Sequence, residues 1–125
     1  MESLGLRTTI YMVSDLDAAK AWYSKAFGFH PYFEEAYYVG FDIAGFELGL
    51  MPEEKPGEKG ENVIAYWGVE DIEKAFKDLI DIGATEIMKP TNVGGLIVVA
   101  SANDPWGNAI GLIYNPEFKI RLKKK

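Results

Sequence analysis

The sequence predicts an α+β fold of two tandem βαβββ modules that form a curved mixed sheet around a concave cavity, with the helices outside. Two repeated motifs support this prediction. Residues 13–17 (VSDLD) recur as residues 69–73 (VEDIE), and residues 45–51 (GFELGLM) recur in the same order as residues 107–113 (GNAIGLI). Each copy of the first motif follows an apolar run and precedes apolar residues at helical spacing. Because one helix covers only one face of a sheet, neither module can protect its sheet alone.

The first module is expected to span residues 6–52. Asp15 is a suitable N-cap for its helix, with Ser14 as a competitor for that role. Gly28 stands where a left-handed residue would end the helix. The predicted strands of this module cover residues 8–12, 32–35, 38–43 and 46–51.

The second module is expected to span residues 62–115, after a polar linker at 53–61 and before a basic tail at 116–125. Asp71 is the expected N-cap of its helix, and Gly83 is the residue expected to end it. The strands of this module are predicted at residues 63–68, 96–102 and 109–114, and a type I turn at residues 104–107 (DPWG) joins the last two.

Composition excludes several kinds of protein. The 19 acidic residues outnumber the 13 basic ones, and the net charge of −6 argues against a nucleic-acid surface and is compatible with a cationic ligand. Cysteine is absent and His30 is the single histidine, which excludes thiolate sites and sites with several histidines from one chain. No run approaches the roughly 20 apolar residues of a membrane-spanning helix. Since no secretory signal is visible, a cytoplasmic location is expected.

Three segments resemble the vicinal oxygen chelate superfamily, which includes glyoxalase I, bleomycin-resistance proteins and extradiol dioxygenases. They are VSDLDAAKAWYSKAFGF, VEDIEKAFKDLIDIGA and DPWGNAIGLIYN. The resemblance covers residues 6–115 and implies that the chain binds a small organic molecule and forms a homodimer. It does not fix a reaction, because this fold serves many chemistries.

Metal-using members of this superfamily bind one divalent ion through four strand residues, two from each module. The resemblance places these positions at Thr8, Gly49, Ile64 and Gly111. None of them carries the imidazole or carboxylate that such an ion requires. A register shift of two residues keeps the same strand face and recovers only Glu47. The chain is therefore expected to use no cofactor and to be closest in character to the metal-free bleomycin-resistance branch.

The concave face is expected to be mostly apolar, as pockets for small organic ligands are. Glu47 is its one candidate charge, expected to be solvated or paired with a cationic ligand, and the alternative is a raised pKa and a role as general base. Gly49 and Gly111 leave space for a ligand unless neighbouring side chains fill it. Tyr37, Tyr38 and Phe41 are candidates for the mouth of the cavity. The candidate ligand-binding residues are Met12, Phe41, Glu47, Ile64, Tyr66 and Trp106.

The resulting hypothesis is a metal-free protein that binds and sequesters a small molecule with an apolar or aromatic body, with a positive charge as a further option. The alternative is an enzyme of the same superfamily. It would be a lyase, isomerase or dioxygenase with atypical metal ligands, or a metal-free acid–base enzyme that uses Glu47. A third hypothesis is an interaction protein whose core is closed.

Overall fold

The computed structural model describes residues 1–4, 6–54, 59–60 and 63–118. Most of the predicted linker and residues 119–125 of the predicted basic tail lie outside the described residues. The chain divides into two compact units. Unit 1 comprises Met1–Gly60 and Trp106–Asn108, and unit 2 comprises Glu61–Pro105 and Ala109–Lys125.

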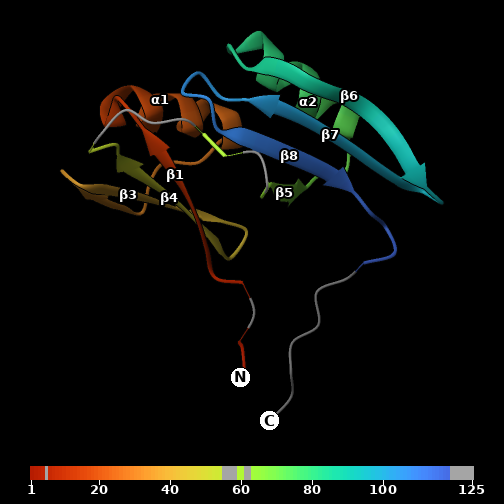
Figure 1. Cartoon of the computed structure of the whole chain (residues 1–125), viewed down its shortest axis with the longest axis horizontal. Coiled ribbons are helices and arrows are strands. Elements are labelled where there is room, and N and C mark those ends of the chain that lie inside the picture. The colour runs from red at the N-terminus through yellow and green to blue at the C-terminus, as the bar shows by residue number, and fades with distance from the viewer. Residues whose placement is uncertain (5, 55–58, 61–62, 119–125) are drawn as a thin grey trace. The chain divides into compact units, whose positions relative to one another are not determined.

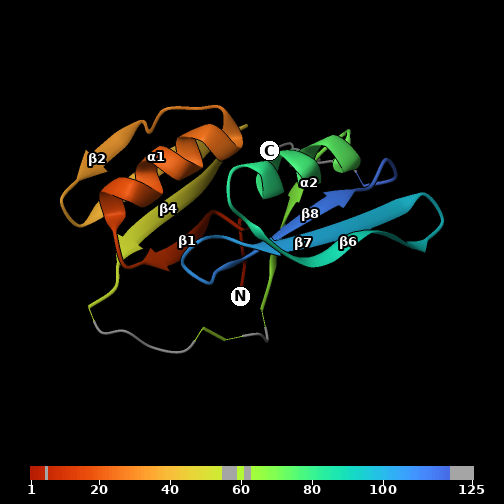
Figure 2. The same cartoon turned by 90° about the horizontal axis from the view of Figure 1, so that it is seen from above.

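Unit 1 has a four-stranded mixed sheet, called sheet A, and one helix (Figure 1). The strand order is β1-β4-β3-β2, with β1 parallel to β4 and the other neighbours antiparallel. The helix α1 packs on one face of sheet A, against β3 and β4 (Figure 2). The elements are β1 (Thr8–Val13), α1 (Leu16–Phe27), β2 (Phe33–Glu35), β3 (Tyr38–Ile43) and β4 (Phe46–Pro52).

Unit 2 repeats this arrangement with a second four-stranded sheet in the order β5-β8-β7-β6. Here β5 is parallel to β8, and the remaining pairs are antiparallel. The helix α2 packs against β6, β7 and β8. The predicted α+β class with two βαβββ modules is therefore confirmed. The elements are β5 (Ala65–Gly68), α2 (Ile72–Asp81), β6 (Thr85–Gly94), β7 (Ile97–Asn103) and β8 (Ala109–Tyr114).

The helix ends follow the capping chemistry that the sequence predicts. The Asp15 carboxylate accepts the Ala18 N–H at the start of α1, so Asp15 and not Ser14 is the N-cap. Asp71 accepts the Lys74 N–H at the start of α2 in the same way. Gly28 follows α1 with a left-handed φ of 74°, and such a conformation is readily accessible to glycine. Gly83 follows the last turn of α2 with a φ of 110°.

The predicted βαβββ plan requires the strand β6, but the sequence analysis assigned no residues to it. It spans Thr85–Gly94 at the edge of its sheet, and nine of its ten residues are exposed. Its pairing with β7 shifts register at three places, and Pro90 lies within it. An exposed edge strand with irregular pairing shows no clean alternation of apolar and polar residues, so hydrophobic periodicity cannot find it.

The core of unit 1 lies between α1 and one face of sheet A. Tyr11 and Val13 of β1 are buried there with Ala19, Trp22 and Tyr23 of α1. The rings of Tyr11 and Tyr23 stack with centroids 5.7 Å apart. The strand residues that complete this core are Val39, Phe41, Leu48 and Leu50.

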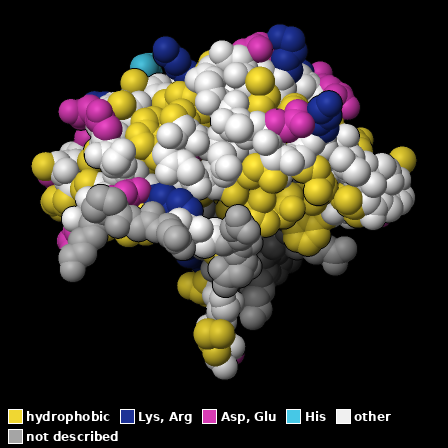
Figure 3. Space-filling view, turned by 45° about the horizontal axis from the view of Figure 1, so that its top comes forward, with side chains coloured by type: hydrophobic (Ala, Val, Ile, Leu, Met, Phe, Trp, Pro, Cys, Tyr) yellow, Lys and Arg dark blue, Asp and Glu magenta, His cyan; other side chains and the backbone are white. Residues whose placement is uncertain are grey.

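Many hydrophobic side chains also reach the surface of the chain, with acidic and basic side chains among them (Figure 3). Several of them belong to the face of sheet A opposite α1, and the candidate site lies on that face. Within the described residues, no helix is both long and apolar enough to span a membrane.

Candidate functional site

The candidate site is the face of sheet A opposite α1, called here the helix-free face. The pairing register lines up Ile10 with Gly49, Gly49 with Gly40, and Gly40 with Phe33 across all four strands. Because successive strand residues point to opposite faces, the members of this face follow from that row. They are Thr8, Ile10, Met12, Phe33, Glu35, Tyr38, Gly40, Asp42, Glu47, Gly49 and Met51.

Two tyrosine rings lie over the two glycines in the middle of this face. A Cβ placed on Gly49 would be 2.7 Å from both Cε1 and Cζ of Tyr38, and closer still to its hydroxyl oxygen. A Cβ on Gly40 would be 3.2 Å from Tyr38 Cε2 and 3.3 Å from Tyr32 Cε1. The tyrosine rings therefore pack directly against the backbone at the two glycines. At Gly49, the side chain of Tyr38 takes up the space that the sequence left open for a ligand.

The carboxylate of Glu47 accepts a hydrogen bond from each of these tyrosines. The hydroxyl of Tyr32 donates a hydrogen bond to Oε1 of Glu47, and the hydroxyl of Tyr38 donates one to Oε2. Asp42, the cross-strand partner of Glu47, instead accepts the backbone N–H of Gly45. Glu47 is half-buried, and its carboxylate lies between two hydroxyl donors.

The protonation state of this triad follows from its hydrogen bonds. The hydroxyls of Tyr32 and Tyr38 stabilise the charged carboxylate and lower the pKa of Glu47. The hydrogen bond to Glu47 raises the pKa of Tyr32, and burial followed by the same kind of bond raises the pKa of Tyr38. At neutral pH the triad is therefore two neutral phenols around one carboxylate anion. The lowered pKa of Glu47 is the opposite of the raised pKa that a general base at this position would need.

A pH titration should reveal the triad. Because the pKa of Glu47 is lowered, the two hydrogen bonds stabilise the fold fully above the ordinary glutamate pKa of 4.5, and this contribution is lost as the pH falls through the lowered value. Carbon-detected NMR of the carboxyl group should place its midpoint below 4.5. Tyr32→Phe, which removes one donor and keeps the ring, should move that midpoint upward. An unchanged midpoint in this variant would contradict the assigned hydrogen bond.

The predicted site residues are divided between the two units. Met12 and Glu47 share the helix-free face, and Met12 is 45% exposed. Trp106 belongs to unit 1, where its ring meets that of Trp22 edge-on at 6.2 Å. Ile64 and Tyr66 belong to unit 2, where the Tyr66 ring lies over Gly111 and fills the space above it.

The expectation that Phe41 lines the cavity mouth is wrong. Phe41 is fully buried, and its partner in the register is Leu48, which is also fully buried. Both residues face α1, because Phe41 has the opposite strand parity to Gly40 and Asp42. The aromatic residues that do build the site are Tyr32, Phe33 and Tyr38. This register could have been inferred from the sequence. A two-residue turn at Ala44 and Gly45 pairs β3 with β4 and places Phe41 opposite Leu48.

The four family metal positions do not offer a metal site. Thr8 and Gly49 lie in unit 1, and Ile64 and Gly111 lie in unit 2. The side chains at these positions are one threonine hydroxyl, one isoleucine and two glycines. They cannot replace the imidazole and carboxylate ligands of a catalytic divalent ion. In the part of the chain that the structure describes, no group of three or more histidine, cysteine, aspartate or glutamate side chains is arranged to hold an ion. A divalent metal therefore has no evident place in the chemistry of these residues.

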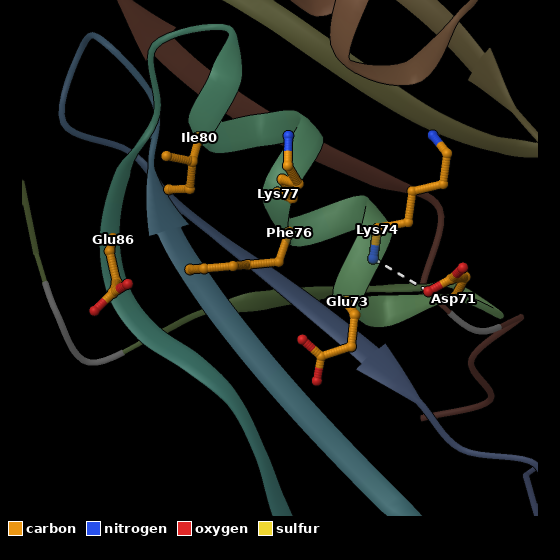
Figure 4. Close-up of a pocket in the computed structure, with 7 residues that line it drawn as sticks. All are labelled: Asp71, Glu73, Lys74, Phe76, Lys77, Ile80 and Glu86. Carbon is orange, nitrogen blue, oxygen red and sulfur yellow. Dashed lines mark hydrogen bonds between the residues drawn. The ribbon is translucent and has the colours of Figure 1, made fainter.

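Two surface hollows are lined mostly by residues other than those of the helix-free face. One, of about 610 Å³, lies between α2 and β6 of unit 2 (Figure 4). Phe76 and Ile80 extend from α2 toward β6, and Glu86 lies on that strand. The lysines at the rim already form ion pairs, Lys74 with Asp78 and Lys77 with Asp81.

The second hollow, of about 470 Å³, lies in unit 1 beside the start of α1. Lys20 and Glu34 form an ion pair of 2.7 Å within it. Neither hollow combines exposed rings with a charge held by hydrogen bonds, as the helix-free face does. The helix-free face is therefore the stronger candidate.

Comparisons with known proteins place the chain in a family. A model of the Glyoxalase/Bleomycin resistance protein/Dioxygenase superfamily matches residues 5–112. No curated protein matches the sequence. A glyoxalase-related enzyme from Fulvimarina pelagi has a similar structure, with a TM-score of 0.80 and 15% sequence identity over 95% of this chain and 94% of that one.

Two other solved structures are similar at comparable levels. A glyoxalase/bleomycin resistance protein/dioxygenase family enzyme from Burkholderia phytofirmans has a TM-score of 0.75 and 20% identity, over 86% of this chain and 95% of that one. A genomically encoded fosfomycin resistance protein from Listeria monocytogenes has a TM-score of 0.73 and 18% identity, over 94% and 96%. At such identities these structures establish the fold alone. Because the family model covers most of the sequence, the chain belongs to the Glyoxalase/Bleomycin resistance protein/Dioxygenase superfamily.

Proposed function

We propose that this chain is a metal-independent binding protein that sequesters a small organic molecule with an apolar or aromatic body and a positive charge. The observation that carries the proposal is the Glu47 carboxylate, held ionised by Tyr32 and Tyr38 on an exposed apolar face. Ile10 and Met12 of the same face are 46% and 45% exposed. A fixed anion among apolar side chains attracts a cation that can also bury its organic part.

The other charges on the helix-free face support a cationic ligand. The charged residues that its strands contribute are Glu35, Asp42 and Glu47, and all three are acidic. Lys20 pairs with Glu34, which has the opposite strand parity to Phe33 and Glu35. The face therefore presents a negative potential, which favours cations and disfavours anions such as phosphonates and carboxylates.

Catalysis through Glu47 has less support. A carboxylate whose pKa is lowered by two hydroxyl donors is a weaker proton acceptor than an ordinary glutamate. A metal-dependent reaction would require ligands other than the residues at Thr8, Gly49, Ile64 and Gly111. The binding function remains the proposal that the described residues support best.

Calorimetric titration with benzylammonium and with neutral benzyl alcohol tests this function. We expect the cation to bind more tightly than the alcohol, with the same affinity in the presence of EDTA. Glu47→Gln keeps the shape of the side chain and should weaken binding of the cation by about tenfold, the effect of losing one charge-assisted contact. Glu35→Gln removes the same charge from the edge of the sheet and should change the affinity little. Equal affinities for the cation and the alcohol would refute the proposal, as would a requirement for metal.

The homodimer and the cytoplasmic location belong to this proposal as well, and both rest on the family resemblance and the composition. Light scattering on the purified chain should give twice the chain mass of 13.9 kDa. A single-chain mass at working concentrations would remove the dimer from the proposal and leave the ligand chemistry of unit 1 unaffected.

A further inference from the structure

We infer that the helix-free face selects an organic ammonium ion whose nitrogen carries alkyl groups, in preference to a primary ammonium or a guanidinium ion. This inference rests on the proposed function and specifies the ligand class of the same site. It follows from three features of the site. Each carboxylate oxygen of Glu47 already accepts one hydrogen bond, aromatic rings lie nearby, and the charged residues of the face are all acidic.

Both oxygens of Glu47 already accept a hydrogen bond. Tyr32 donates to one oxygen and Tyr38 to the other. A guanidinium ion binds a carboxylate best through two parallel N–H bonds, one to each oxygen, and here it would have to share both oxygens with the phenols. A primary ammonium ion would likewise share an oxygen. An alkylated ammonium ion donates few hydrogen bonds or none, so it requires only the negative charge, which the triad supplies.

Three aromatic rings form a continuous cluster next to that charge. The ring centroids of Tyr32 and Phe33 are 6.4 Å apart, and those of Phe33 and Tyr38 are 6.1 Å apart. Tyr32 is 61% exposed and Phe33 is 41% exposed, so the ring surfaces are accessible to a ligand. Ring faces attract cations, and aromatic groups are a common means of recognising quaternary ammonium ions. Such ions also lose less hydration than a primary ammonium ion when they contact a ring.

The neighbouring glycines allow this arrangement. A side chain at Gly49 would displace the ring of Tyr38, and one at Gly40 would make tight contacts of 3.2 Å with Tyr38 and 3.3 Å with Tyr32. At Gly49, where metal-using relatives place a ligand, the chain therefore has an aromatic ring and a hydrogen-bonded carboxylate nearby.

The test is a matched series of benzyl compounds titrated into the full chain: benzyltrimethylammonium, benzylammonium, benzylguanidinium and benzyl alcohol. We expect benzyltrimethylammonium to bind about threefold to fivefold more tightly than either of the other cations, in line with cation–π contacts to exposed rings. If benzylammonium or benzylguanidinium binds as tightly, the inference is overturned and the proposed function survives. If all three cations bind no better than benzyl alcohol, the proposed function fails, and the inference fails with it.

Two variants of Tyr32 separate the ring from its hydroxyl. Tyr32→Phe keeps the ring and removes one hydrogen bond to Glu47, whereas Tyr32→Leu removes both. We expect Tyr32→Phe to retain the preference for benzyltrimethylammonium over benzylammonium and Tyr32→Leu to reduce it severalfold. Because Tyr32 is exposed, both variants should fold, and a thermal melt checks this directly. An equal preference in the two variants would show that the ring takes no part in selection.

Discussion

Replacing Phe41 with alanine should lower the free energy of unfolding by about 3–5 kcal/mol, the usual cost of removing a buried phenylalanine side chain. Phe41 is fully buried between sheet A and α1, beside Leu48 and Leu50, which are also fully buried. The side chains around the resulting cavity would lose their packing contacts with the ring, and the apolar cavity would not be filled by water. Denaturant-induced unfolding followed by fluorescence measures the change.

Tyr37 provides the control for this prediction. It stands next to β3, is 63% exposed, and should tolerate alanine with a change of about 0.5 kcal/mol or less. The contrast also distinguishes a core residue from a ligand-lining one. If Phe41→Ala left stability unchanged and weakened only the binding of organic cations, Phe41 would belong to the site after all.

Gly49→Ala should produce the second large effect, a loss of about 1–3 kcal/mol in stability together with loss of cation binding. The added methyl group would lie 2.7 Å from two ring carbons of Tyr38, so the ring must move away from its place over β4. Moving it breaks the hydrogen bond from Tyr38 to Glu47 and exposes the carboxylate. Unfolding measurements and calorimetry on the same sample follow both consequences.

A double-mutant cycle identifies the cause. Tyr38→Leu removes the ring that Gly49→Ala displaces, so the two substitutions together should cost less than the sum of the single effects. Gly68→Ala is a matched control in β5, because a Cβ there meets nothing within 4 Å. If the effects of Gly49→Ala and Tyr38→Leu on stability were strictly additive, the cost of Gly49→Ala would not come from contact with the Tyr38 ring.

The strands and helices show where sequence patterns are sufficient. In β1, Tyr11 and Val13 are buried against the helix, whereas Ile10 and Met12 are exposed on the opposite face. Such a pattern is readable because one face of the strand is buried and the other is not. The strand β6 is exposed on both faces, so it carries no such pattern, and the sequence left its residues unassigned.

Glu47 shows where sequence patterns are insufficient. Its candidacy came from strand parity, and its position on the helix-free face agrees with that parity. Its protonation behaviour, however, depends on two hydroxyl groups that come from residues 9 and 15 positions away. A raised pKa was a reasonable alternative for a carboxylate in an apolar setting, and the two donors reverse its direction.

The sequence by itself determined the duplicated βαβββ plan and the helix caps at Asp15 and Asp71. These features depend on residue type and local spacing, which a sequence contains in full. Only the tertiary structure decided which rings lie over Gly40 and Gly49, that Phe41 faces the core, and that Glu47 is held as an anion. Those features depend on strand register and on side-chain reach across the sheet, which no single segment of the chain specifies.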